Sequence, residues 1–240
     1  MGLFDKLFKS KGKKGILVNV QLNARYQPID RGAYVDLTGR FLQEKGWGSL
    51  GDGEGTMLSP TEEPEFCDFD ILVPAEHLND VTAALDKVFF VPKGSKLLIG
   101  DEERPIGQQE GLALYLNGTD LPDEVYRTSD INAVIGSLES HLGEERGRFL
   151  SFWQGPKETA LYFYGPNYQA MKAALEEIIP EHPLCENAAW NKLHKNKADG
   201  SCEPSAFSLA YKVTPVLKIA RSWKPLRSEQ SFSPLATART

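Results

Sequence analysis

The sequence has few of the residues that build stable crosslinks and common metal sites. It holds three cysteines and four histidines in 240 residues, which is too few cysteines for a disulfide framework. His182, Cys185, His194 and Cys202 could be arranged as zinc ligands, but their spacing matches no standard zinc motif. We therefore expect no metal, no cofactor and no disulfide-stabilised scaffold.

Long apolar runs and catalytic motifs are also missing. No run approaches the roughly 18 residues that a membrane-spanning helix requires, and the basic start is not followed by the apolar region of a signal peptide. The stretch GDGEGT at 51–56 lacks the Gly-Lys-Ser/Thr of a phosphate-binding loop, and we interpret its glycines as allowing positive φ in a tight turn. No nucleophile elbow is present. The sequence favours a cytoplasmic protein that is not an enzyme and does not insert stably into membranes.

Charge is unevenly distributed along the chain. The net charge of −6 combines +5 over residues 1–50, −17 over 51–190 and +6 over 191–240. An acidic middle repels phosphate backbones, which argues against a nucleic-acid ligand, and it would attract a basic protein partner. Simple solubility is the alternative explanation, because excess charge needs no partner.

Two halves of the chain repeat one pattern. The matched segments are LNARYQP at 22–28 with LNGTDLP at 116–122, FDILVP at 69–74 with LYFYGP at 161–166, and AALDKV at 83–88 with AALEEI at 173–178. The displacement falls from 94 to 92 to 90 residues, as small loop deletions would produce. An internal duplication accounts for the shared order and spacing.

Each half predicts the element order βαββαβ. In the first half, strands are expected at 16–22, 53–58, 65–73 and 95–100, with one helix after the first strand and another over 77–88. In the second half, strands are expected at 112–116, in a hairpin through 149–164 and near 188–193, with helices from about 129 and over 168–179. This order resembles the ferredoxin-like, or α/β-plait, superfamily. The resemblance implies an α+β protein of two tandem ferredoxin-like repeats, in which each antiparallel sheet has helices on one face.

The remaining segments match neither repeat. We place the repeats at 15–100 and 107–194, after a basic amphipathic segment at 1–14. Residues 195–240 are rich in Ser, Pro, Lys and Arg and are interpreted as a mostly disordered basic tail.

Strand alternation assigns side chains to the two faces of each sheet. Away from the helices, the first sheet presents Asp68 and Asp70, which Asp52 and Glu54 of the glycine-rich stretch could join. The second sheet presents aromatic side chains, namely Tyr115, Trp153, Tyr162 and Tyr164. Aromatic residues of this kind are favoured at interfaces. These faces either bind a partner or pack on each other or on a second copy in a homodimer. The basic and aromatic signature of an RNA-binding sheet is absent.

The main functional hypothesis is a non-enzymatic cytoplasmic binding protein. The stretch GDGEGTMLSPTEEPEFCDFDILVP resembles small bacterial proteins associated with toxin–immunity loci, which implies an immunity protein that neutralises a basic toxin by direct contact. One alternative is a regulatory protein that binds a small molecule between the repeats. Another is an enzyme that uses the acidic residues of the first repeat. The eight acidic and aromatic residues named above are the candidate partner-binding site.

Overall fold

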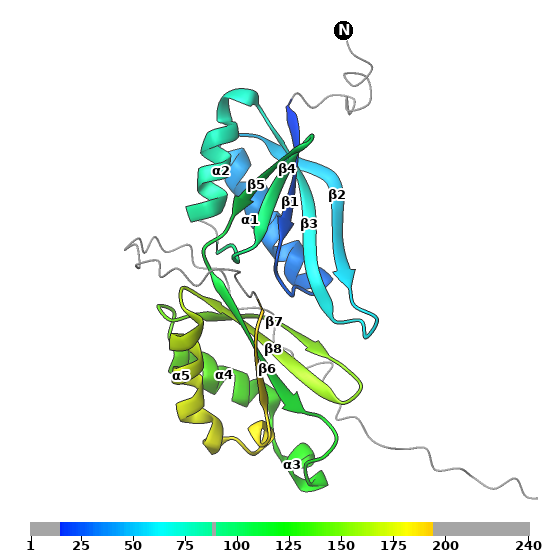
Figure 1. Cartoon of the computed structure of the whole chain (residues 1–240), viewed down its shortest axis with the longest axis vertical. Coiled ribbons are helices and arrows are strands. Elements are labelled where there is room, and N and C mark those ends of the chain that lie inside the picture. The colour runs from blue at the N-terminus through cyan, green and yellow to red at the C-terminus, as the bar shows by residue number, and fades with distance from the viewer. Residues whose placement is uncertain (1–14, 88–89, 194–240) are drawn as a thin grey trace, which may run out of the picture.

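The chain forms two α+β units joined end to end, as the computed structural model shows for residues 15–87 and 90–193 (Figure 1). The expectations for 1–14 and 195–240 lie outside the described residues and stay predictions. Within the described ranges, no helix is long and apolar enough to span a membrane.

The first unit is a five-stranded antiparallel sheet with two helices on one face. Its elements are β1 (Ile16–Leu22), α1 (Pro28–Lys45), β2 (Ser49–Leu58), β3 (Pro64–Val73), α2 (Leu78–Lys87), β4 (Ser95–Ile99) and β5 (Glu102–Ile106), with a short 3-10 turn at Ala75–His77. The strand order is β2-β3-β1-β4-β5. The first four of these strands have the ferredoxin-like order, and β5 is an addition at the edge.

The second unit repeats the arrangement without the extra strand. Its elements are β6 (Glu110–Asn117), α3 (Asp123–Thr128), α4 (Ile131–Leu142), β7 (Arg148–Gln154), β8 (Glu158–Gly165), α5 (Tyr168–Ile178) and β9 (Ala189–Lys192), with 3-10 turns at Ile179–Glu181 and Pro183–Cys185. The strand order is β7-β8-β6-β9. The predicted fold class, two tandem ferredoxin-like repeats, is therefore confirmed.

Local sequence signals fix the ends of the main helices. Pro28 begins α1, where its missing N–H costs nothing, and Gly46 ends that helix in the left-handed region at φ 68°. The Asp130 side chain accepts a hydrogen bond from the Asn132 amide at the start of α4. Asn167 does the same for the Ala170 amide of α5, at 2.9 Å. These caps satisfy amides that have no partner within the helix.

The duplication extends to the register of the strands. Leu22 pairs with Cys67 between β1 and β3, and the residues displaced by 94 and 92 positions, Leu116 and Thr159, pair between β6 and β8. Both central hairpins also carry a register shift at corresponding places, after Leu50 in β2 and after Phe149 in β7. A shared register places equivalent residues on the same face in both repeats.

The two repeats share part of one apolar core. The first core cluster contains the helix-facing side chains of the first sheet, including Val18, Val20 and Leu22, which are at most 1% exposed. The same cluster includes side chains from the far face of the second sheet: Ala113, Trp153, Ala160, Tyr162 and Tyr164. The open face of the second sheet is therefore covered by the first repeat, while a separate cluster lies between that sheet and helices α4 and α5.

Candidate functional site

The aromatic half of the predicted site is buried rather than open to a partner. Tyr162 and Tyr164 are 0% exposed and Trp153 is 5% exposed, while Tyr115 is partly buried against the same cluster. The expectation that these residues form a free binding surface is wrong, because the first repeat occupies that face. The alternative in which the two open faces pack on each other holds only in part: the aromatic face of the second sheet packs against the first repeat, but not against the face that carries Asp68 and Asp70.

Hydrogen bonds hold this aromatic face against the first repeat. The Tyr164 hydroxyl accepts from the Arg25 amide at 2.8 Å. The hydroxyls of Tyr115 and Tyr162 both donate to one Glu63 oxygen, each at 2.8 Å. Burial, followed by the adjacent Glu63 carboxylate, raises the pKa of both tyrosines, so they remain neutral donors at ordinary pH.

The acidic half of the predicted site is divided between two faces. Asp68 and Asp70 lie half-buried on the open face of the first sheet, where Asn19 Nδ2 donates to Asp68 Oδ2 and to Asp70 Oδ1, both at 2.9 Å. Glu54 pairs instead with Arg31 of α1 at 3.4 Å, on the helix side. Asp52 is exposed in the register shift of β2. No group of three or more metal-capable side chains forms within the described residues.

The glycines of GDGEGT have a different role from the predicted one. Gly51, Gly53 and Gly55 are not among the residues with positive φ. A Cβ at Gly53 would lie 2.4 Å from Asp70 Oδ2, and one at Gly55 would lie 2.9 Å from Asp68 Oδ1. These glycines therefore let the two aspartates lie directly against the β2 backbone.

A pocket that the sequence analysis missed lies in the first repeat beside the linker to the second. It is a shallow pocket, open to solvent, with a volume of about 320 Å³, and its lining residues are Asp86, Lys93, Gly94, Pro105, Ile106 and Gly107. They come from the end of α2, the turn before β4 and the end of β5. The sequence signal that could have located it is the pair of Pro-X-Gly turns at 92–94 and 105–107.

Both of these turns require their glycine. Gly94 has φ 86° and Gly107 has φ 97°, in the region that side chains disfavour. A Cβ at Gly107 would also lie 2.1 Å from the Pro92 carbonyl oxygen. The Gly107 amide donates to Asp86 Oδ1 at 2.8 Å, and Gln108 Nε2 donates to Asp86 Oδ2 at 3.2 Å. The linker is thereby tied to the end of α2 at the pocket wall.

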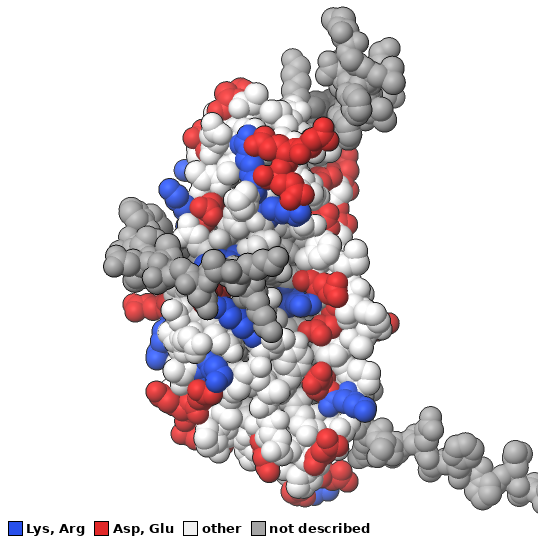
Figure 2. Space-filling model, in the orientation of Figure 1, with Lys and Arg blue, Asp and Glu red and all other residues white. Residues whose placement is uncertain are grey.

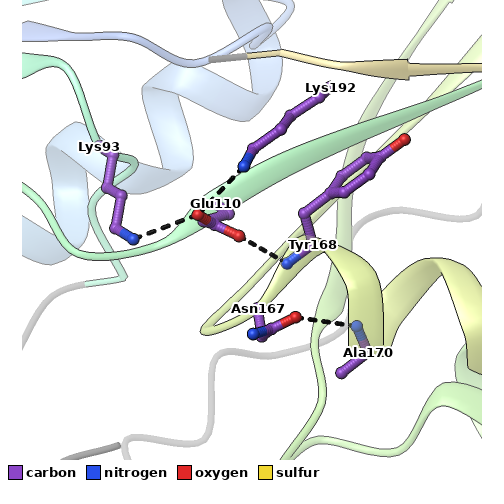
Figure 3. A network of polar contacts seen from close by, with 6 residues as sticks. All are labelled: Lys93, Glu110, Asn167, Tyr168, Ala170 and Lys192. Atoms are coloured by element: carbon purple, nitrogen blue, oxygen red, sulfur yellow. Dashed lines mark hydrogen bonds and ion pairs between the residues drawn. The ribbon is translucent and has the colours of Figure 1, made fainter. Parts of the chain in front are cut away.

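Lys93 belongs both to this pocket and to a polar network between the repeats (Figure 3). Its ammonium lies 3.2 Å from Glu110 Oε1, and Lys192 Nζ of β9 lies 3.3 Å from the same oxygen. The other Glu110 oxygen accepts from the Tyr168 amide at the start of α5, at 2.7 Å. Glu110 therefore connects the turn before β4 with β9 and α5.

The charge state of Glu110 follows from these contacts. Burial works to raise the pKa of its carboxyl, but the Tyr168 amide and the ammonium groups of Lys93 and Lys192 outweigh it, so the pKa lies below its ordinary value. Figure 2 shows basic and acidic side chains over both repeats, and both kinds occur at the level where the repeats meet.

Comparisons with known proteins assign the chain to no family. It is a tandem ferredoxin-like protein by its own strand order. No family model matches it, and no curated protein matches its sequence. The comparisons give no support to the expected likeness to immunity proteins.

Solved structures with partial similarity include the regulatory subunit of aspartate kinase from Thermus thermophilus, at 12% identity over 68% of this chain and 92% of that chain, with a TM-score of 0.23. An unknown protein from Galdieria sulphuraria is 11% identical over 75% and 97%, with a TM-score of 0.26. An anthrone oxidase-like protein is 10% identical over 78% and 98%, with a TM-score of 0.23. Similarity at this level carries no argument about function.

Proposed function

We propose that the protein is a non-enzymatic small-molecule-binding protein whose ligand occupies the pocket beside the linker. The observation that carries this proposal is that Lys93 lines the pocket and also contacts Glu110 across the boundary between the repeats. A ligand there would touch the groups that connect the two halves of the chain. The sequence analysis also considered a small-molecule ligand, but placed it between the repeats. Side chains of both repeats fill that space, so the proposed ligand site lies beside the linker instead.

The composition of the pocket suits a small polar ligand. Asp86 and Lys93 provide charged groups, while Pro105 and Ile106 provide an apolar wall. Binding pockets commonly combine apolar lining with a few placed polar groups. The pocket is open and its volume of about 320 Å³ is small, which favours a metabolite over a large cofactor.

Amide chemical-shift mapping tests this function. A set of common metabolites is titrated into the 15N-labelled full chain, and shifts are expected at Gly94, Ile106 and Gly107. The control variant is Pro105→Trp, which places an indole over the pocket and is expected to abolish the shifts. Shifts confined to other regions, or the absence of any responding metabolite, would contradict the proposed site.

A second candidate function rests on the first sheet. Asp68 and Asp70 lie on its open face, which the first repeat's helices do not cover, and the Asn19 amide donates to both. A basic protein partner would find complementary charge there. A basic protein captured from a cell lysate by the full chain serves as the partner in this test. Replacing both aspartates with Asn is expected to slow its association and to flatten the salt dependence, as stopped-flow kinetics would measure. An unchanged association rate would exclude this face.

A further inference from the structure

We propose that the pocket binds an anionic group, a carboxylate or a phosphate, through Lys93, and that this anion competes with Glu110 for the Lys93 ammonium. This inference rests on the proposed function and specifies its ligand class. It assigns Lys93 two alternative partners, one inside the protein and one in the pocket.

Asp86 and Lys93, the two charged residues of the pocket, differ in how many of their polar atoms already have hydrogen-bond partners. Both oxygens of Asp86 already accept hydrogen bonds, from the Gly107 amide and from Gln108 Nε2. Asp86 is thereby committed to holding the linker. The Lys93 side chain is 28% exposed, and its ammonium carries three donors. The group available to a ligand is therefore a cation, which selects an anion.

The backbone of Lys93 is fixed while its side chain is not. The Lys93 amide donates to the Gln109 carbonyl at 2.7 Å, and Pro92 forms an isolated parallel bridge with Gln109. The ammonium, in contrast, reaches Glu110 through a single contact at the end of a flexible chain. Partly exposed ion pairs of this kind are weak. A ligand anion can thus redirect the side chain without moving the turn that carries it.

Glu110 still has two polar partners when Lys93 turns away from it. The Tyr168 amide donates to one of its oxygens at 2.7 Å, and Lys192 remains 3.3 Å from the other. A partly buried carboxylate left without partners would be costly, but here one amide and one ammonium remain. The exchange of Lys93 from Glu110 to a ligand therefore leaves no unpaired charge.

Calorimetric titration of the full chain with inorganic phosphate, and separately with succinate, tests the assignment. Lys93→Gln is expected to weaken binding about tenfold or more, because it removes the charged donor, and Lys93→Arg to retain it. Glu110→Gln is expected to tighten binding by about threefold, because it frees Lys93 from its competitor. Gln at this position still accepts from the Tyr168 amide, so the fold should be kept.

Two lysines serve as matched controls. Lys192→Gln removes the other ammonium on Glu110 without touching the pocket lining, and Lys96→Gln removes an ammonium of β4 that pairs with Glu103 at 2.9 Å. Lys96→Gln is expected to bind within about twofold of the unaltered chain, as exposed charge pairs usually do. Lys192→Gln is expected to weaken binding less than Lys93→Gln does, because Glu110 then keeps only the Tyr168 amide when Lys93 leaves it. Stronger binding of phosphate than of succinate identifies a phosphate ligand, and the reverse order identifies a carboxylate.

Three results would overturn the inference. They are wild-type affinity in Lys93→Gln, no tightening in a folded Glu110→Gln variant, and equal losses in the Lys93 and Lys192 variants. Its failure is distinguishable from that of the proposed function. A neutral metabolite that shifts the Gly94 and Gly107 amides equally in the unaltered and Lys93→Gln chains would retain the pocket as a ligand site and exclude the anion.

Discussion

Single side chains in this protein hold groups of like charge together. Asn19 does so on the open face of the first sheet, where one amide nitrogen donates to Asp68 and to Asp70 at 2.9 Å each. The amide nitrogen has two hydrogens, so both bonds can exist at once. Without the Asn19 side chain, the carboxylates of Asp68 and Asp70 would lie close together with no donor between them.

Replacing Asn19 with Ala is expected to lower the free energy of unfolding by about 1–2 kcal/mol, because hydrogen bonds to two charged acceptors are lost. Gln21→Ala is the control, since Gln21 lies on the same strand and face. Urea denaturation measures both. The loss in Asn19→Ala should shrink at 1 M salt, where charge repulsion is screened; a loss independent of salt would assign the effect to packing.

The contacts of Glu110 predict how the free energy of unfolding depends on pH. Its folded pKa lies below its ordinary value of 4.5, so its charge stabilises the fold fully above that value and the contribution is lost as the pH falls through the folded pKa. The unfolding free energy of the unaltered chain should therefore exceed that of Glu110→Gln at pH 7, and the gap should close under acid conditions. If the difference in unfolding free energy between the two chains persists at pH 2.5, the charge of Glu110 is not its cause.

At the scale of elements, strand alternation predicted which side chains share a face but not what covers each face. Tyr162 and Tyr164 lie on the side of the second sheet that alternation assigns to them. Their neighbours come from the first repeat, more than 90 residues away in sequence, and periodicity carries no information about such contacts. Element order was therefore predictable, whereas the exposure of the aromatic face was not.

The elements that the sequence analysis missed depart from local rules. β5 contains Pro105 and three charged residues, a composition that argues against a strand. It forms because it lies at the edge of the sheet, where a proline without an N–H is tolerated. The pocket was missed for a related reason, since three segments that are separate in sequence form its walls.

Buried aromatic residues between elements predict a large effect of truncation. Tyr162→Ala should destabilise the protein by about 3–5 kcal/mol, because it leaves a cavity between β8 and the first repeat. Tyr162→Phe should cost only about 1 kcal/mol, since it removes one hydrogen bond to Glu63 and Tyr115 still donates to that carboxylate. Thermal denaturation compares the two variants. Equal and small losses would mean that the ring is not part of the core.

At the scale of the whole molecule, the duplicated units have diverged in the use of one surface. The open face of the first sheet carries Asn19, Asp68 and Asp70, while the equivalent face of the second carries aromatic side chains that the first repeat covers. The polar face needs no cover, but the aromatic one does. Sequence and register show the common origin, and the chemistry of these faces explains why the repeats are not interchangeable.

The shared core predicts that the two repeats unfold together. Trp153, Tyr162 and Tyr164 belong to the cluster that also contains Val20 and Phe69 of the first sheet, so separating the repeats exposes both sides of that cluster. We expect one calorimetric transition with equal calorimetric and van't Hoff enthalpies. The matched perturbation is Tyr164→Ala, which should lower the midpoint of thermal unfolding without splitting the transition.

The second repeat by itself offers a further test. Residues 107–194 expressed alone should bind a hydrophobic dye that the full chain does not bind, because the aromatic face is then open. Two resolved transitions in the full chain, together with no dye binding by the isolated second repeat, would show that the contact between the repeats contributes little to stability.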